Sequence, residues 1–179
     1  EQVVLTLNKR GITNIPKDVN VSLLLDYSYS MSSHYSNGAV SRVLQRLLSI
    51  SNVIDDDGNL ELVIFENGAN HVGTLNVSQF DTTDRIVDQI RSKYSMGGTN
   101  FAPAVDKILS VLSAGSSIGK AFGGFFGKKP AVEGKQLLVM ISDGDNGDHK
   151  EFAQAVKTIE SMPNVYLQCV AIGYDSRSL

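Results

Sequence analysis

Four short runs rich in Val, Ile and Leu constrain the fold of this chain more than any other feature. They cover residues 19–25, 60–65, 136–142 and 165–172. Three of them are apolar almost without alternation, which is typical of strands covered on both faces. We therefore expect four buried strands in one sheet.

Between these runs, apolar residues recur at helical spacing, in stripes that begin at Val40, Ile86, Val105 and Phe152. Strands that alternate with helices predict an α/β fold, with a doubly wound, mostly parallel sheet and helices on both faces. Residues 70–77 follow the second run after a turn-like stretch, and we interpret them as one antiparallel edge strand.

The length of 179 residues suits one domain. We divide the chain into a lead-in over 1–18, with a short strand at 3–7, and a domain over 19–179. Residues 115–135 read as an insertion rich in Gly, Phe and Lys, because they are too long for a minimal connection.

Composition narrows the functional classes. A net charge of −3 gives no global basic field that would indicate nucleic-acid binding. No apolar run approaches the roughly 20 residues that span a membrane. The single cysteine, Cys169, rules out an internal disulfide, which fits a reducing compartment. Because Cys169 lies in an apolar run, we expect it in the core.

Polar residues follow two of the predicted strands. Asp26 follows the first run and opens the pattern D-x-S-x-S with Ser28 and Ser30, and Asp143 follows the third run. In open α/β sheets, ligands bind beyond the carboxyl ends of the strands, so we expect both acids at one edge. Thr99, in a Gly-Gly-Thr-Asn loop, can add a hydroxyl from a third loop.

Oxygen ligands of this kind suit a hard divalent cation. The serine hydroxyls can bind the ion directly, and the two aspartates supply charge directly or through water. A site with few direct carboxylates keeps its ion electrophilic and leaves one position free. An acidic side chain of another protein can fill that position. We expect Mg²⁺, with Mn²⁺ or Ca²⁺ as alternatives.

The five residues resemble the metal-ion-dependent adhesion site (MIDAS) of von Willebrand factor A (VWA) domains. The resemblance covers roughly residues 20 to 175 and is closest to the bacterial tellurium-resistance and stress-response branch (TerF-like). The stretches that carry it include "YSNGAVSRVLQRLL", "GGTNFAPAV" and "SDGDNGD". It implies a VWA fold, a metal-binding site, a protein partner and a setting in a bacterial cytoplasmic stress or metal-resistance system.

Four further residues flank the expected ion or face the partner: Tyr29, Asn100, Asp145 and Asp148. Tyr29 stands where the family often has Gly, so the first loop is bulkier here. Asp145 and Asp148 can tune the field of the site or hold water, and a role at a helix start is an equal alternative.

The sequence therefore predicts a non-enzymatic, cation-dependent protein-binding module. One alternative is a metal-dependent hydrolase or phosphatase, but phosphatases with an aspartate nucleophile usually place a second acid where this chain has Ser28. Another is a membrane-associated scaffold acting through 115–130, whose glycines oppose a stable amphipathic helix. If Asp26 only began a polar turn, the presence of Thr99 and Asp143 at the expected positions would be a coincidence.

Two other polar features call for simpler interpretations. The run Asp55 to Gly58 has the wrong glycine position for an EF-hand loop, and we interpret it as a solvated turn. His34 and His149 flank the expected site, but no pair of histidines has the spacing of zinc ligands on one helix.

Overall fold

The computed structural model describes residues 15, 17–55, 57–115, 132–144 and 146–173. The strand expected at 3–7, most of the expected insertion and Asp145 lie outside these residues.

The centre of the molecule is a sheet of five strands in the order β3-β2-β1-β4-β5. Strand β1 pairs in parallel with both β2 and β4, β4 pairs in parallel with β5, and β3 is antiparallel to β2. The mostly parallel sheet and its antiparallel edge are confirmed. The strands are β1 (Val19–Asp26), β2 (Asn59–Phe65), β3 (Ala69–Asn76), β4 (Lys135–Ser142) and β5 (Val165–Ala171).

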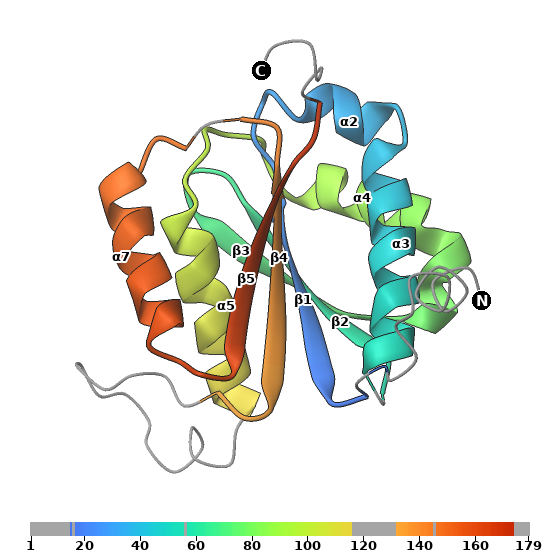
Figure 1. Ribbon diagram of the computed structural model, residues 1–179. Coiled ribbons are helices and arrows are strands. Elements are labelled where there is room, and N and C mark those ends of the chain that lie inside the picture. The colour runs from blue at the N-terminus through green and yellow to red at the C-terminus, as the bar shows by residue number, and fades with distance from the viewer. Residues whose placement is uncertain (1–14, 16, 56, 116–131, 145, 174–179) are drawn as a thin grey trace.

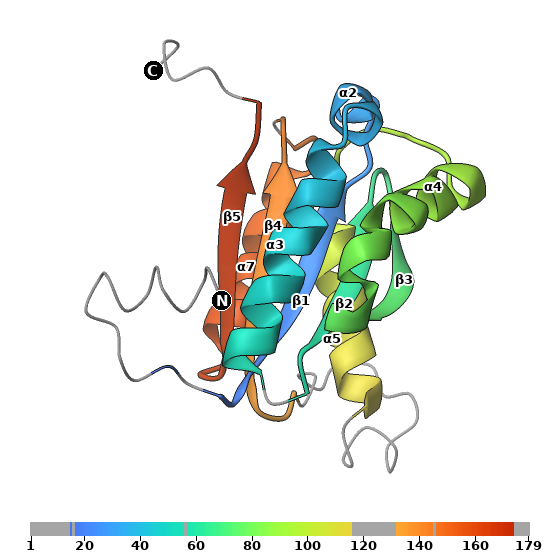
Figure 2. The same cartoon turned by 90° about the vertical axis from the view of Figure 1, so that its right-hand side faces the viewer.

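Helices cover both faces of the sheet, so the doubly wound α/β fold is confirmed (Figures 1 and 2). One face carries α2, α3 and α4, and the other carries α5 and α7. The bounds are α2 (Ser32–Ser36), α3 (Ala39–Ile54), the 3-10 helix η1 (Val77–Thr82), α4 (Thr83–Lys93), α5 (Ala102–Gly115) and α7 (His149–Glu160). Within the described ranges, no helix is long and apolar enough to cross a membrane.

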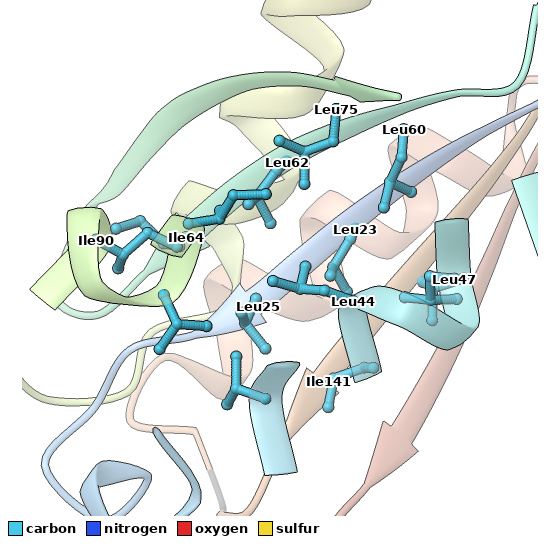
Figure 3. Close-up of a cluster of buried hydrophobic side chains, with 14 of the residues drawn as sticks. Leu23, Leu25, Leu44, Leu47, Leu60, Leu62, Ile64, Leu75, Ile90 and Ile141 are labelled. Atoms are coloured by element: carbon cyan, nitrogen blue, oxygen red, sulfur yellow. The ribbon is translucent and has the colours of Figure 1, made fainter. Parts of the chain in front are cut away.

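Strand β1 divides the hydrophobic core into two layers because successive side chains point to opposite faces. Leu23 and Leu25 pack with the α3 side, shown in Figure 3, whereas Leu24 packs with the α5 and α7 side. All three are fully buried. Burial of such a side chain stabilises the fold by roughly 1.5–3 kcal/mol. This two-sided burial explains the apolar run without alternation.

Strand β5 differs from the prediction of a buried strand. It lies at the sheet edge, and Tyr166 and Val170 are 56% and 39% exposed. Cys169 is exposed as well, so its expected place in the core is wrong. The error has a physical cause. An apolar run shows only that a strand consists of apolar residues, whereas the elements packed beside the strand decide whether it is buried.

Candidate metal centre

Two neighbouring parallel strands bring the predicted site together. Strand β1 ends at Asp26 and β4 at Ser142, at the same edge of the sheet (Figure 1, top). The loop after β1 is fastened by Tyr27 N–H, which donates to Phe65 O at 2.7 Å, and by Tyr29 N–H, which donates to Gly97 O at 3.0 Å. We call this carboxyl edge, with Asp26, Ser28, Ser30, Thr99 and Asp143, the rim.

Asp26 is fully buried, and both of its carboxyl oxygens accept hydrogen bonds. Ser28 N–H donates to Oδ1 at 2.7 Å, and Ser142 Oγ donates to Oδ2 at 2.5 Å. Burial raises the pKa of Asp26 and the nearby charge of Asp143 adds to the rise, although the bonds from Ser142 and Ser28 oppose it. The carboxyl group is thus fixed in position, and its negative charge is incompletely compensated.

The hydroxyls connect the first loop to Asp143. Ser28 Oγ lies 3.0 Å from Ser30 Oγ, and Ser30 Oγ donates to Asp143 Oδ1 at 2.7 Å. These serines therefore link four of the five predicted ligands by hydrogen bonds. The linked residues lie up to 117 positions apart in the sequence. Their side chains present only oxygen atoms, the donor type that hard divalent cations prefer.

Thr99 lies in a loop that is attached to both of the others. Ser28 and Gly97 form a parallel bridge, and Gly147 N–H donates to Thr99 O at 2.8 Å. The two glycines of this loop lie against side chains of the loop after β2, which would have to shift if either glycine carried a Cβ. A Cβ at Gly97 would lie 2.5 Å from Glu66 Oε2, and one at Gly98 would lie 2.6 Å from Asn67 Oδ1.

Asn100 and Asp148 fix the rim loops. Asn100 N–H donates to Glu66 O at 2.8 Å, and its Nδ2 donates to Asn67 O at 3.2 Å. Asp148 Oδ1 and Oδ2 accept from the backbone N–H groups of Phe101 and Ala102 at 2.9 and 2.8 Å. Asp148 therefore caps the start of α5, which is a different helix from the one that it precedes in the sequence.

Hydrogen bonding decides the charge of Asp148. Burial opposes its ionisation, but bonds from Asn146 Nδ2, Phe101 N–H and Ala102 N–H outweigh burial and lower its pKa. The ionised carboxylate also lies favourably at the positive end of the α5 dipole.

Tyr29 and His34 shape the approach to the rim. Tyr29 is 71% exposed, so its ring stands in solvent while its backbone is held by Gly97. His34 Nε2 lies 3.9 Å from Asp143 Oδ2. Among the described residues, no group of three or more His, Cys, Asp or Glu side chains could hold a metal.

Ser142 is the rim residue that sequence reasoning missed. It is buried and donates to Asp26 across the β1–β4 pair. Its signal is modest: a serine directly before Asp143, at the end of a strand expected beside the first.

Comparisons with known proteins agree with this geometry. The model of the vWA-TerF-like family, described as a vWA found in the TerF C terminus, matches residues 18–178. The chain is also 26% identical over 110 residues to YcbR, an uncharacterized protein of Bacillus subtilis. That match covers 61% of this chain and 44% of YcbR, so the chain spans less than half of this relative.

Solved structures share the fold. BatB from Bacteroides thetaiotaomicron aligns with a TM-score of 0.54 at 18% identity, over 86% of this chain and 66% of that one. The manganese-loaded TRAP protein of Plasmodium vivax aligns with a TM-score of 0.56 at 18% identity, over 90% of this chain and 60% of that one. At such identities the likeness concerns the fold alone.

Proposed function

Because the chain belongs to the vWA-TerF-like family, we propose that it is a divalent-cation-dependent protein-binding module. A VWA domain supports a protein-interaction role in general. The metal dependence rests on one observation, the hydrogen-bonded set of Asp26, Ser28, Ser30 and Asp143 at the rim.

In this proposal, the ion is bound by the hydroxyls of Ser28 and Ser30 and by the carboxylate of Asp143. Asp26 supplies negative charge from its buried position, and Thr99 adds a hydroxyl. Mg²⁺ suits the oxygen-only donors, and Mn²⁺, present in the TRAP structure, has the same ligand preference. A carboxylate of a protein partner completes the coordination shell, and Tyr29 contacts the surface around it.

We further propose that the domain is not an enzyme. A nucleophilic aspartate must reach its substrate, whereas Asp26 is fully buried and both of its oxygens accept hydrogen bonds. This favours a charge-supplying role over a phosphatase mechanism. The membrane-scaffold alternative rests on residues 115–130, nearly all of which lie outside the described residues.

The family suggests the setting. Since the chain resembles the bacterial tellurium-resistance and stress-response branch of VWA domains, we propose a role in such a system in the cytoplasm. The lone cysteine fits a reducing compartment.

Metal titration tests the proposal. Mg²⁺, Mn²⁺ and Ca²⁺ are added separately to the purified protein while the thermal midpoint is followed. At least one cation should raise the midpoint, because a ligand that binds only the folded state stabilises it. Ser28→Ala should weaken the response, whereas Ser32→Ala, which changes an exposed serine four positions further on, should leave it intact.

A pull-down from bacterial extract with and without EDTA then tests the partner. Capture that needs the cation, and that Ser28→Ala abolishes, supports a metal-bridged partner. An absent thermal response, or an equal response in both serine variants, contradicts the metal site.

A further inference from the structure

The amino-terminal edge of the sheet, opposite the rim, contains a second polar hollow of about 380 Å³. Strands β1, β2 and β4 form its floor, and the end of α5 borders it through Leu112. We call it the amino-end hollow. Its described lining includes Ser22, Gln136 and the four acidic residues Asp55, Asp57, Glu61 and Glu133.

Strand register gathers these side chains on one face. Asn20 pairs with Gln136, and Ser22 pairs with Glu61. Leu24, two residues beyond Ser22 on the same face, packs in the layer beneath α5 and α7. The hollow therefore occupies the place where the hydrophobic layer under α5 ends and polar residues begin.

Two residues that line this hollow each carry a buried polar atom with no hydrogen-bond partner among the described residues. These atoms are Ser22 Oγ and Gln136 Oε1, in residues that are 1% and 3% exposed. The amide nitrogen of Gln136 is engaged, since it donates to Glu133 O at 2.8 Å. An unpaired buried polar atom is costly, so a ligand that donates a hydrogen bond to it removes that cost.

The charges of the hollow decide which ligand fits. Its described lining holds four acidic residues and no Lys, Arg or His. Glu61 is already engaged by His71 Nε2 at 2.7 Å and Thr74 Oγ1 at 2.8 Å. Asp55 is buried at 7% exposure, so the expected solvated turn is wrong at this position. Anions are therefore disfavoured.

A cation that donates hydrogen bonds suits the acidic lining and the unpaired acceptor oxygens. An ammonium group has both properties, because it carries a positive charge, three donors and no acceptor. It can donate to Gln136 Oε1, to the lone pairs of Ser22 Oγ and to a carboxylate of the hollow. We propose that the amino-end hollow binds the primary ammonium group of a small organic amine or of a lysine side chain.

NMR spectroscopy tests this proposal on the whole chain. Putrescine, spermidine and N-acetyl-lysine amide are titrated while the side-chain amide signals of Gln136 are followed. At least one amine should shift these signals saturably. Preference for the free polyamines indicates a metabolite ligand, and preference for the lysine derivative indicates a lysine of a polypeptide.

Two variants and a control separate the site from general charge attraction. Ser22→Ala removes an unpaired hydroxyl, so the fold should persist while affinity falls about tenfold, as expected for one bond to a charged group. Asp57→Asn should weaken binding severalfold, and Asp88→Asn, which removes an exposed charge on α4, should change nothing. Unmoved Gln136 signals, unchanged affinity in Ser22→Ala, or equal losses in both aspartate variants would overturn the proposal.

Discussion

Both ends of the sheet contain buried polar side chains, but these side chains differ in how completely they are hydrogen-bonded. At the rim, buried Asp26 has a donor on each oxygen, and Ser28 and Ser30 connect it to Asp143. At the amino-end hollow, equally buried Ser22 has no hydrogen-bond partner in the described part of the chain. The rim is thus arranged before any ligand arrives, whereas the hollow keeps two buried polar atoms without a partner among the described residues.

This difference shows how each end can select its ligand. At the rim, the fixed negative charge of Asp26 and the oxygen-only side chains favour a compact, highly charged cation. At the hollow, the unpaired acceptor oxygen of Gln136 favours a ligand that donates hydrogen bonds. The serines Ser142 and Ser22 form a natural pair for testing the contrast, since both are buried and only Ser142 donates to a carboxylate.

The largest effect is expected from Asp26→Asn. The change keeps the shape of the side chain but removes its charge, so cation affinity should fall about 100-fold or more, measured by calorimetry. This loss is expected because oxygen-ligated cations depend strongly on carboxylate charge.

The same variant should be more stable than the wild type at neutral pH without metal. The pKa of Asp26 is raised above 3.8, so the folded state binds its proton more tightly than the unfolded chain does. Stability therefore falls as pH rises from 3.8 through the raised pKa, and asparagine removes that loss. Urea unfolding across this pH range checks the sign. A variant that retains cation affinity would contradict the role of Asp26.

Ser142→Ala should destabilise the protein by about 2 kcal/mol, because a buried carboxylate loses a charge-assisted hydrogen bond. The pKa of Asp26 should rise further, since the bond from Ser142 opposes its elevation. Cation binding should then require a higher pH than in the wild type. Calorimetric titrations at several pH values test this, and an unchanged pH profile would exclude a role for Ser142 in setting the charge of Asp26.

Asp148→Ala should cost about 1–2 kcal/mol, the usual value for losing a helix cap. The pKa of Asp148 is lowered from 3.8, so its contribution is present above pH 3.8 and is lost as pH falls through the depressed value. The variant and the wild type should therefore converge in stability in acid. Urea unfolding at neutral and acidic pH measures the difference, and an equal gap at both would contradict capping by the ionised form.

Sequence patterns predicted the sheet well because two-sided burial leaves a direct trace in composition, as in the run Leu23 to Leu25. They failed at β5, where the exposure of Cys169 depends on what covers the edge. They also failed at Asp55, a charged residue that is nonetheless buried.

At the candidate metal site, too, some features could be predicted from the sequence and others could not. The D-x-S-x-S spacing is local and could be found in the sequence, and parallel strands placed Asp143 beside it. The cap that Asp148 provides could not be predicted, because it joins residues 46 and 47 positions apart. Ser142 shows the same limit: its bond to Asp26 spans 116 positions.

The smallest effect, and the one of opposite sign, is expected from Ser22→Ala. Without a ligand, the variant should be more stable than the wild type by roughly 1 kcal/mol, because removing an unpaired buried hydroxyl removes its desolvation cost. Urea unfolding in amine-free buffer measures the change, with Ser142→Ala as the matched buried serine. If Ser22→Ala were destabilised as much as Ser142→Ala, Ser22 would have a hydrogen-bond partner in solution, and the contrast between the two ends of the sheet would no longer hold.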